Sequence, residues 1–359
     1  MRDAATVHLR EAGHSGASGV AIPSYGVPPG RAPTGARRDA RGGPSTRCSP
    51  FYPRSMITAP STVPSSTSGA AAAPSPREHR FAQVDVFGSE PYGGNPVAVV
   101  LDAEGLSDVQ MQAVACWTNL SETTFVLPPT TPEADYRLRI WTPGGELPFA
   151  GHPTLGSAHA WIEAGGSPAD PSLIRQEVAA GIIPIRRAED GVLSFQAPPT
   201  VHDGPLEPGL LERLTEALGL RPEQVLAHQW VDNGPGWTVL RLGSAEEVLA
   251  VEPDLAAVPD AMVGVIGALP AGSEQDLEMR TFAPGVGVAE DPVCGSMNAS
   301  VGQWLLREGI VDGGYRVRQG TALGRSGDVH VEVEPGPDGL AAVWVGGPTT
   351  TLLRGTALA

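Results

Sequence analysis

Apolar positions follow no regular spacing before residue 81, and from Phe81 onwards they follow the patterns of strands and helices. Phe81 and Val84 begin a strand, and the unbroken apolar run at 97–101 is typical of a buried strand. The run Gly93-Gly94-Asn95-Pro96 between them predicts a turn. Further strands are expected at 123–127, 136–140, within 175–195, and at 237–242, 262–266, 277–282, 329–333 and 341–345.

Four segments have the spacing of helices with one apolar face. Ser107 is a good N-cap for the first, which is expected to run to about residue 117. Many short strands around one long helix per half predict two pseudo-symmetric α+β domains, each a barrel-like sheet around a central helix. The other helices are expected at about 153–164, 210–218 and 296–308.

A short motif occurs twice, with 144 residues between Glu146 and Glu290. Its front half reads Arg-x-aromatic-x-Pro, and its back half reads Glu-x-Pro-x-x-Gly-His/Ser. A repeat of this length indicates duplication, and two similar domains usually face each other across a cleft that binds small molecules. The first copy comprises Arg139, Trp141, Pro143, Glu146, Pro148, Gly151 and His152, and the second comprises Arg280, Phe282, Pro284, Glu290, Pro292, Gly295 and Ser296.

Both copies end in a glycine and a polar residue where a helix is expected to begin. The exposed N–H groups and the dipole of a helix start attract anions. Gly151, Gly295 and Ser296 are therefore candidates for binding a small carboxylate. The alternative is that the two glycines make tight turns and that Ser296 only caps a helix.

Three residues could carry acid–base chemistry. Glu122 lies between Leu120 and Phe125, a partly buried setting in which a carboxyl pKa rises toward neutrality. His152 could relay a proton, and Asp291 could orient His152 or a substrate amine. Each also has a plain structural alternative: a surface glutamate, a packed histidine and a turn-capping aspartate.

The residue types argue against several cofactors. All 24 basic residues are Arg, so neither a lysine Schiff base to pyridoxal phosphate nor a Walker phosphate loop is available. His152 and His159 lie seven apart without an acidic partner at ligand spacing, so no metal is expected. Cys294 beside a helix start could be an activated thiol, although a buried filler is the simpler interpretation. No cofactor is predicted.

The charge distribution bears on partners. The chain has a formal charge of −16, and because residues 1–80 carry ten Arg against four acidic residues, the remainder is strongly acidic. An acidic body argues against nucleic acid as a partner. No apolar run approaches the roughly 20 residues of a membrane span. The three Cys lack metal or redox spacing, which favours a reducing compartment such as the cytoplasm.

The organisation predicted from these patterns is a tail at 1–80, domains at 81–198 and 199–345, and a final segment at 346–359 that could return to the first domain. The tail is rich in Pro, Gly, Ser, Ala and Arg, a composition typical of disorder. A transit peptide is a second interpretation of the tail. A third, which we favour, is a true start at Met56.

Four ordered stretches of the chain resemble the PhzF family of phenazine-biosynthesis isomerases. They are DVFGSEPYGGNP at 85–96, NLSETTFV at 119–126, TPGGELPFAGHPTLGS at 142–157 and EDPVCGSMN at 290–298. The resemblance implies the diaminopimelate-epimerase-like fold and a cofactor-free, metal-free isomerase that is often a homodimer. Phenazine members of the family isomerise trans-2,3-dihydro-3-hydroxyanthranilate.

The resemblance also implies roles for individual residues. Glu122 matches the family's catalytic Glu, and Gly151 lies at its substrate-binding turn. His152, Asp291 and Ser296 match accessory positions. One departure is Cys294, which stands where the family usually has Thr, so the substrate stays open.

Three functions are consistent with these observations. The first is a proton-shifting isomerase in which Glu122 takes a proton from an activated carbon and returns it elsewhere on a small carboxylate substrate. The second is an epimerase or racemase that uses Glu122 and Cys294 as opposed bases. The third is a catalytically silent binding protein that retains the fold.

Overall fold

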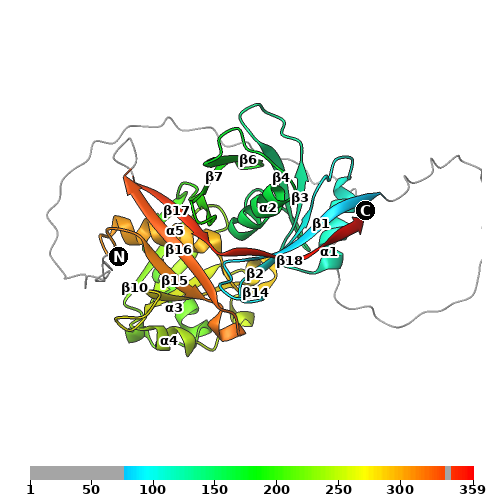
Figure 1. The fold of residues 1–359 in the computed structure, drawn as a ribbon. Coiled ribbons are helices and arrows are strands. Elements are labelled where there is room, and N and C mark those ends of the chain that lie inside the picture. The colour runs from blue at the N-terminus through cyan, green and yellow to red at the C-terminus, as the bar shows by residue number, and fades with distance from the viewer. Residues whose placement is uncertain (1–76, 336–340) are drawn as a thin grey trace, which may run out of the picture.

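The first half of the molecule wraps a curved sheet around one buried helix, α2 (Figure 1). The computed structural model describes residues 77–335 and 341–359. Of the tail predicted at 1–80, residues 1–76 lie outside these residues, as does the proposed start at Met56. The end of the predicted tail is wrong, because the first strand begins at Glu78, where the chain pairs with the last strand. The elements of the first half are β1 (Glu78–Val86), β2 (Asn95–Val100), α1 (Asp108–Thr118), β3 (Thr123–Leu127), β4 (Tyr136–Thr142), β5 (Gly145–Leu147), α2 (Gly151–Glu163), β6 (Leu173–Val178), β7 (Gly181–Arg187) and β8 (Leu193–Gln196).

The second half repeats the same order of elements around α5. It begins with β9 (His202–Gly204) and α3 (Pro208–Ala217), which precede the repeated unit. The repeated unit consists of β10 (Ala227–Asp232), β11 (Thr238–Arg241), α4 (Ala245–Leu249), β12 (Val263–Ala268), β13 (Leu277–Ala283), β14 (Val288–Asp291), α5 (Gly295–Arg307), β15 (Tyr315–Gln319), β16 (Gly327–Pro335) and β17 (Ala341–Gly347).

Strand pairing shows that the two halves are copies. In each half the first strand pairs antiparallel with the second, and the second pairs parallel with the third across a short helix, α1 or α4. The fourth strand pairs parallel with the strand that follows the central helix, β4 with β6 and β13 with β15. The predicted α+β class with two pseudo-symmetric, barrel-like domains is confirmed.

The two halves exchange terminal strands. β8 and β17 pair antiparallel at the junction, so the described strands form one continuous sheet. The strand after β8, β9, pairs with β10 of the second half, and the strand after β17, β18 (Thr349–Leu358), pairs with β1 of the first half. Figure 1 shows β18 running beside β1. Each half is therefore completed by a strand that leaves the other.

The two central helices are buried because small residues let strands approach them closely. Almost every residue of α2 from Gly151 to Ala160 is buried. A Cβ on Gly156 would lie 2.4 Å from Val97 Cγ1, and a Cβ on Gly302 of α5 would lie 2.9 Å from Val343 Cγ1. Glycine at these positions thus sets the distance between each helix and its sheet.

The repeated motif forms the same ion pair in both halves. Arg139 Nε and Nη2 donate to Glu146 at 2.7 and 2.6 Å, and Arg280 Nε and Nη2 donate to Glu290 at 2.9 Å each. In each half, this bidentate pair links two consecutive strands that precede the central helix: β4 and β5 before α2, and β13 and β14 before α5. Each guanidinium also lies over the motif's aromatic ring, 5.2 Å from the centroid of Trp141 and 5.0 Å from that of Phe282.

The four predicted helices are found as α1, α2, α3 and α5, with limits within about two residues of those expected. Ser107 caps α1 in a capping box with Gln110. The short α4 and the strands β5, β9, β10, β14, β15 and β18 were not anticipated. The turn predicted at 93–96 is displaced, because Asn95 and Pro96 already pair with β1 as the start of β2. Within the described part of the chain, no helix has both the length and the apolar character that a membrane span requires.

The close packing around α2 yields a stability prediction. Gly156→Ala is expected to destabilise the protein by about 1–3 kcal/mol, because its new methyl group overlaps Val97 and Val86. Gly209→Ala is the matched control in α3, where a Cβ meets nothing within 4 Å and is expected to be neutral or stabilising by up to about 1 kcal/mol. Urea denaturation of both variants checks this. Equal stabilities for the two variants would contradict the packing argument.

Candidate active site

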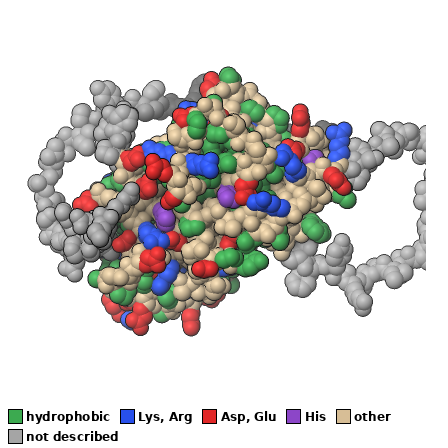
Figure 2. Space-filling view, in the orientation of Figure 1, with side chains coloured by type: hydrophobic (Ala, Val, Ile, Leu, Met, Phe, Trp, Pro, Cys, Tyr) green, Lys and Arg blue, Asp and Glu red, His purple; other side chains and the backbone are tan. Residues whose placement is uncertain are grey.

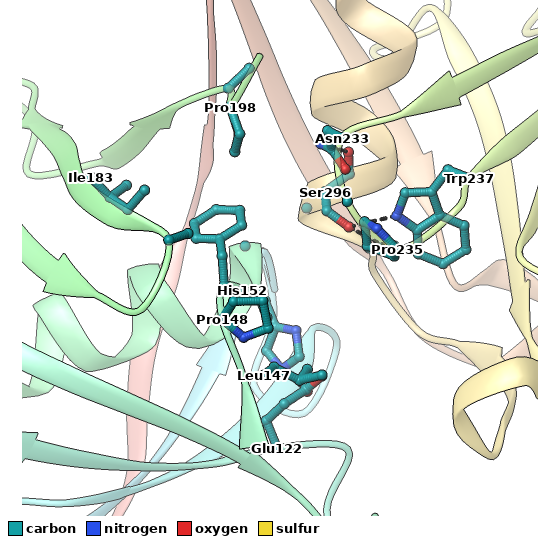
Figure 3. Close-up of a pocket in the computed structure, with 18 of the residues that line it drawn as sticks. Glu122, Leu147, Pro148, His152, Ile183, Pro198, Asn233, Pro235, Trp237 and Ser296 are labelled. Carbon is teal, nitrogen blue, oxygen red and sulfur yellow. Dashed lines mark hydrogen bonds and ion pairs between the residues drawn. The ribbon is translucent and has the colours of Figure 1, made fainter. Parts of the chain in front are cut away.

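A pocket of about 640 Å³ opens between the two halves, and both halves supply its walls. Figure 3 shows Glu122 and His152 on the side of the first half and Asn233, Trp237 and Ser296 on the side of the second. The two short motif strands β5 and β14 lead into this pocket, and the central helices begin at it.

The N-termini of α2 and α5 meet at the floor of the pocket. A Cβ on Gly151 would lie 2.9 Å from Gly295 Cα, and a Cβ on Gly295 would lie 3.1 Å from Gly151 Cα. Any larger residue would push the helices apart. The N-cap residues, Ala150 and Cys294, make no capping side-chain hydrogen bond. Two helix starts without side-chain caps therefore converge on one place, an arrangement that favours a bound anion.

Glu122 lies in the pocket wall between α1 and β3. α1 ends at Asn119, whose left-handed conformation (φ 54°) reverses the chain and places Glu122 just before β3. The Glu122 side chain is 13% exposed. Burial and, to a lesser extent, the nearby Asp291 carboxyl raise its pKa to about 8, while a hydrogen bond from Ser121 opposes the shift. The surface alternative for Glu122 is therefore wrong.

His152 lies in the first turn of α2 and faces Glu122. Its Nε2 is 3.2 Å from Glu122 Oε2, and neither atom has a well-directed hydrogen-bond partner among the described residues. Burial lowers the pKa of His152 to about 3. The imidazole is therefore neutral at physiological pH, and the pair consists of a neutral ring and a carboxyl group that titrates near pH 8.

Asp291 comes from the other half, at the end of β14. Burial raises its pKa to about 6, although hydrogen bonds from the Cys294 thiol, the Val293 N–H and the Asn95 amide oppose the shift. The pocket thus contains two buried carboxyl groups, from Glu122 and Asp291, whose pKa values lie about two units apart. Two acids held at different pKa values can take different roles in proton transfer.

Asn95 connects these groups, and the sequence analysis did not identify it. Its side chain is fully buried at the start of β2. Asn95 Nδ2 lies 2.6 Å from Asp291 Oδ1, 3.0 Å from the Val293 carbonyl oxygen and 3.2 Å from His152 Nδ1. An amide has two N–H donors, so these three acceptors compete for them. The Gly-Gly-Asn-Pro run predicted only a turn, and an asparagine in a turn is usually exposed. The burial of Asn95 therefore became visible only in the structure.

Ser296 and Cys294 complete the second half's side of the site. Ser296 Oγ accepts a hydrogen bond from Trp237 Nε1 at 3.0 Å, and the Ser296 carbonyl accepts one from Asn233 at 3.1 Å. Burial raises the pKa of the Cys294 thiol well above its usual value. Cys294 is therefore a neutral thiol, which agrees with the interpretation as a buried filler.

All six predicted site residues line this single pocket. They are Glu122, His152, Asp291, Gly151, Gly295 and Ser296. Their roles stay predictions, because the geometry shows their positions and not their chemistry. Within the described ranges, no group of three or more His, Cys, Asp or Glu side chains is arranged to hold a metal ion.

The Asn95 contacts predict a measurable pKa change. Asn95→Ala removes a donor that lowers the pKa of Asp291, so that pKa is expected to rise above about 6. Carbon-13 NMR of the labelled Asp carboxyls, assigned with Asp291→Asn, measures it. The control is Asn298→Ala. This change removes a buried amide from the second half, where Asp291 also lies, but the Asn298 side chain makes no contact with Asp291. An unchanged Asp291 titration in Asn95→Ala would contradict the assignment of this contact.

Comparison with known proteins places the chain in a family. Residues 84–355 match the model of the PhzC-PhzF family, described as phenazine biosynthesis-like protein. The chain is 38% identical to Antisense-enhancing sequence 1 of Schizosaccharomyces pombe over 77% of its own length and 98% of that protein. It is 34% identical to trans-2,3-dihydro-3-hydroxyanthranilate isomerase of Pseudomonas aeruginosa over 78% and 99% of the two chains.

Solved structures agree with this placement. A PhzF-family protein of Bacillus anthracis superposes with a TM-score of 0.69 at 25% identity, covering 79% of this chain and all of that one. A predicted epimerase of Pseudomonas aeruginosa gives a TM-score of 0.64 at 28% identity, covering 78% and 99% of the two chains. The chain therefore belongs to the PhzC-PhzF family of phenazine biosynthesis-like isomerases.

Proposed function

We propose that the protein is a cofactor-independent isomerase that moves a proton on a small carboxylate-bearing substrate, with Glu122 as the general acid and base. The observation that carries this proposal is the position of Glu122. It is buried in the pocket where the two helix starts meet, with a pKa of about 8. A general base is most effective when its pKa lies near the working pH.

The substrate carboxylate would bind at the helix starts. The N–H groups that follow Gly151 and Gly295 are free of side-chain caps, and each helix start carries roughly half a positive charge. Ser296 Oγ accepts a hydrogen bond from Trp237 and lies 3.5 Å from Cys294 Sγ, so a carboxylate oxygen would compete only with that weak sulfur acceptor for the hydroxyl proton. This anchor would hold the substrate with its reacting carbon toward Glu122.

The reaction would then be a transfer of one proton in two steps. Glu122 in its carboxylate form takes the proton from a carbon that a neighbouring double bond activates, and the electron pair left behind is delocalised over the unsaturated system. The Glu122 carboxyl then returns that proton to a different carbon of the same system, which regenerates the carboxylate. Burial keeps the proton on the enzyme between the two steps, since little water is present to exchange with it.

The neighbours of Glu122 suit this role. Neutral His152 offers a partner for the carboxyl without stabilising its charged form as a cation would. Asp291 faces the same space and could accept a hydrogen bond from a substrate amine or hydroxyl. The raised thiol pKa of Cys294 argues against the epimerase alternative in which that thiol is the second base, and no observation favours the silent binding protein.

Replacement of Glu122 tests the proposal. Glu122→Gln is expected to lower kcat by about 10²–10⁴-fold, because the amide cannot carry the proton. The assay follows the isomerisation of cyclic unsaturated carboxylates by proton NMR, with trans-2,3-dihydro-3-hydroxyanthranilate, the substrate named for the Pseudomonas aeruginosa relative, as the first probe. Glu163→Gln, on the outer end of α2, is the control and should retain activity. A folded Glu122→Gln protein that isomerises the probe at the wild-type rate would exclude Glu122 as the base.

The pH dependence of activity follows from the same group. If Glu122 must start as a carboxylate, kcat/KM of the wild type should rise with pH and level off above about 8. A value that falls across this range would instead mean that the protonated acid acts first. Rate measurements from pH 5 to 9.5 at constant ionic strength distinguish the two orders of proton transfer.

The raised pKa also predicts a stability effect. The folded-state pKa of Glu122, about 8, lies above the ordinary value of 4.5, so the folded protein binds the proton more tightly than the unfolded chain does. Its contribution is fully present below about pH 4.5 and is lost as the pH rises through 8. Glu122→Gln should therefore become progressively more stable than wild type over this range, by at most about 1.4 kcal/mol per pH unit. Denaturant unfolding of both proteins at pH 5, 6.5 and 8 measures the difference, which should not change with pH if the carboxyl is not buried.

A further inference from the structure

The pocket is lined by few charged side chains. Among its lining residues the only acidic side chains are Glu122 and Asp291, and none is Arg. Elsewhere the surface is different, because Figure 2 shows acidic and basic side chains interspersed over the visible face. The pocket therefore offers a bound anion the partial positive charge of the two helix starts and no Arg side chain.

Most of the remaining lining residues are apolar, and they come from both halves. Figure 3 shows Ile183 and Pro198 on one side and Trp237 on the other. Two further lining residues, Ile182 of the first half and Val286 of the second, are 38% and 51% exposed. Large apolar side chains that line a pocket and are exposed to this degree indicate a place for apolar groups of a ligand.

The size of the pocket exceeds that of a single-ring acid. The relative's substrate, trans-2,3-dihydro-3-hydroxyanthranilate, has roughly eleven non-hydrogen atoms. A water molecule in the liquid takes up about 30 Å³. Even if each atom of this substrate took up that volume, the substrate would fill only about half of a pocket of about 640 Å³. The remaining space is available to further groups of a ligand, and apolar side chains of both halves line the pocket.

We infer that the substrate of this protein is a monocarboxylate with an extended apolar or aromatic body, larger than one substituted ring. This inference rests on the proposed function for the reacting end of the substrate, and it adds the chemical class of the rest of the substrate molecule. The carboxylate lies at the helix starts, and the body lies against the facing apolar walls that include Ile182 and Val286. A second negative group on the body is disfavoured, because no cation in the wall offsets its loss of hydration.

Binding of three aryl acids to the full chain tests the inference by titration calorimetry. Biphenyl-4-carboxylate is expected to bind with a Kd at least about tenfold lower than that of benzoate, since burial of a second ring is favourable. Biphenyl-4,4′-dicarboxylate is expected to lose this gain. Equal affinities for benzoate and biphenyl-4-carboxylate, or a dicarboxylate that binds as tightly as the monocarboxylate, would overturn the inference.

Variants of the apolar wall show whether the gain arises there. Ile182→Asp and Val286→Asp, one in each half and both at exposed positions that tolerate a polar side chain, are expected to reduce the gain to less than about threefold. Leu353→Asp, at an exposed apolar position of β18 outside the pocket, is the matched control and should keep it. A gain that survives both wall variants would overturn the inference.

The same experiments separate this inference from the proposed function. Binding of the aryl acids requires no turnover, so it is measured equally well on Glu122→Gln. Loss of the size preference with isomerisation intact contradicts only the substrate class. A retained size preference in a wild-type protein that isomerises no unsaturated carboxylate contradicts the isomerase mechanism. Because the substrate class depends on that mechanism, the inference then becomes a ligand preference and is no longer a substrate preference.

Discussion

The contact between the two helix starts is the constraint on which the site depends. Gly151 and Gly295 meet so closely that a methyl group on either would overlap the other's backbone. Two like-charged helix ends in contact repel each other, and neither has a side-chain cap to offset the repulsion. Burial of apolar residues around both helices stabilises the arrangement. An anion bound between the ends would relieve the repulsion, which is the physical reason for the proposed carboxylate site.

The buried carboxyl groups follow from the same constraint. The closed junction of the halves leaves Glu122 and Asp291 with little access to water, which raises both pKa values. A buried acid that stays protonated near neutral pH costs stability at higher pH, as is common where acid–base function requires a perturbed group. Asn95 moderates this cost by donating to Asp291, while the neutral ring of His152 lies beside Glu122. The amide of Asn95, a residue of the first half, thus contacts the acid of the second half and the imidazole of the first.

Duplication explains why the two halves present their groups to each other. The same bidentate Arg–Glu pair ties β4 to β5 and β13 to β14, immediately before each central helix. The exchange of β9 and β18 between halves joins them further. The two copies have nevertheless diverged at the pocket, because His152 follows the glycine in the first copy and Ser296 follows it in the second. Symmetry therefore brings two equivalent helix starts together, and the divergence of the copies makes the side chains that follow the two glycines different.

The sequence by itself determined the duplicated α+β architecture, the four longer helices and the six candidate residues, since apolar periodicity, capping and repetition are local signals. Four short sequence stretches, in their order along the chain, also revealed the resemblance to the family. It could not place Glu122, for which a surface position was an open alternative, because burial depends on what the other half covers. Nor did it reveal Asn95, whose partners Asp291 and Val293 lie almost 200 residues away in the chain. Only the tertiary structure decided three features: the exchanged strands, the perturbed pKa values and the apolar wall of the pocket. Each of them arises where the two halves meet, because it depends on contacts between segments that are far apart in the chain.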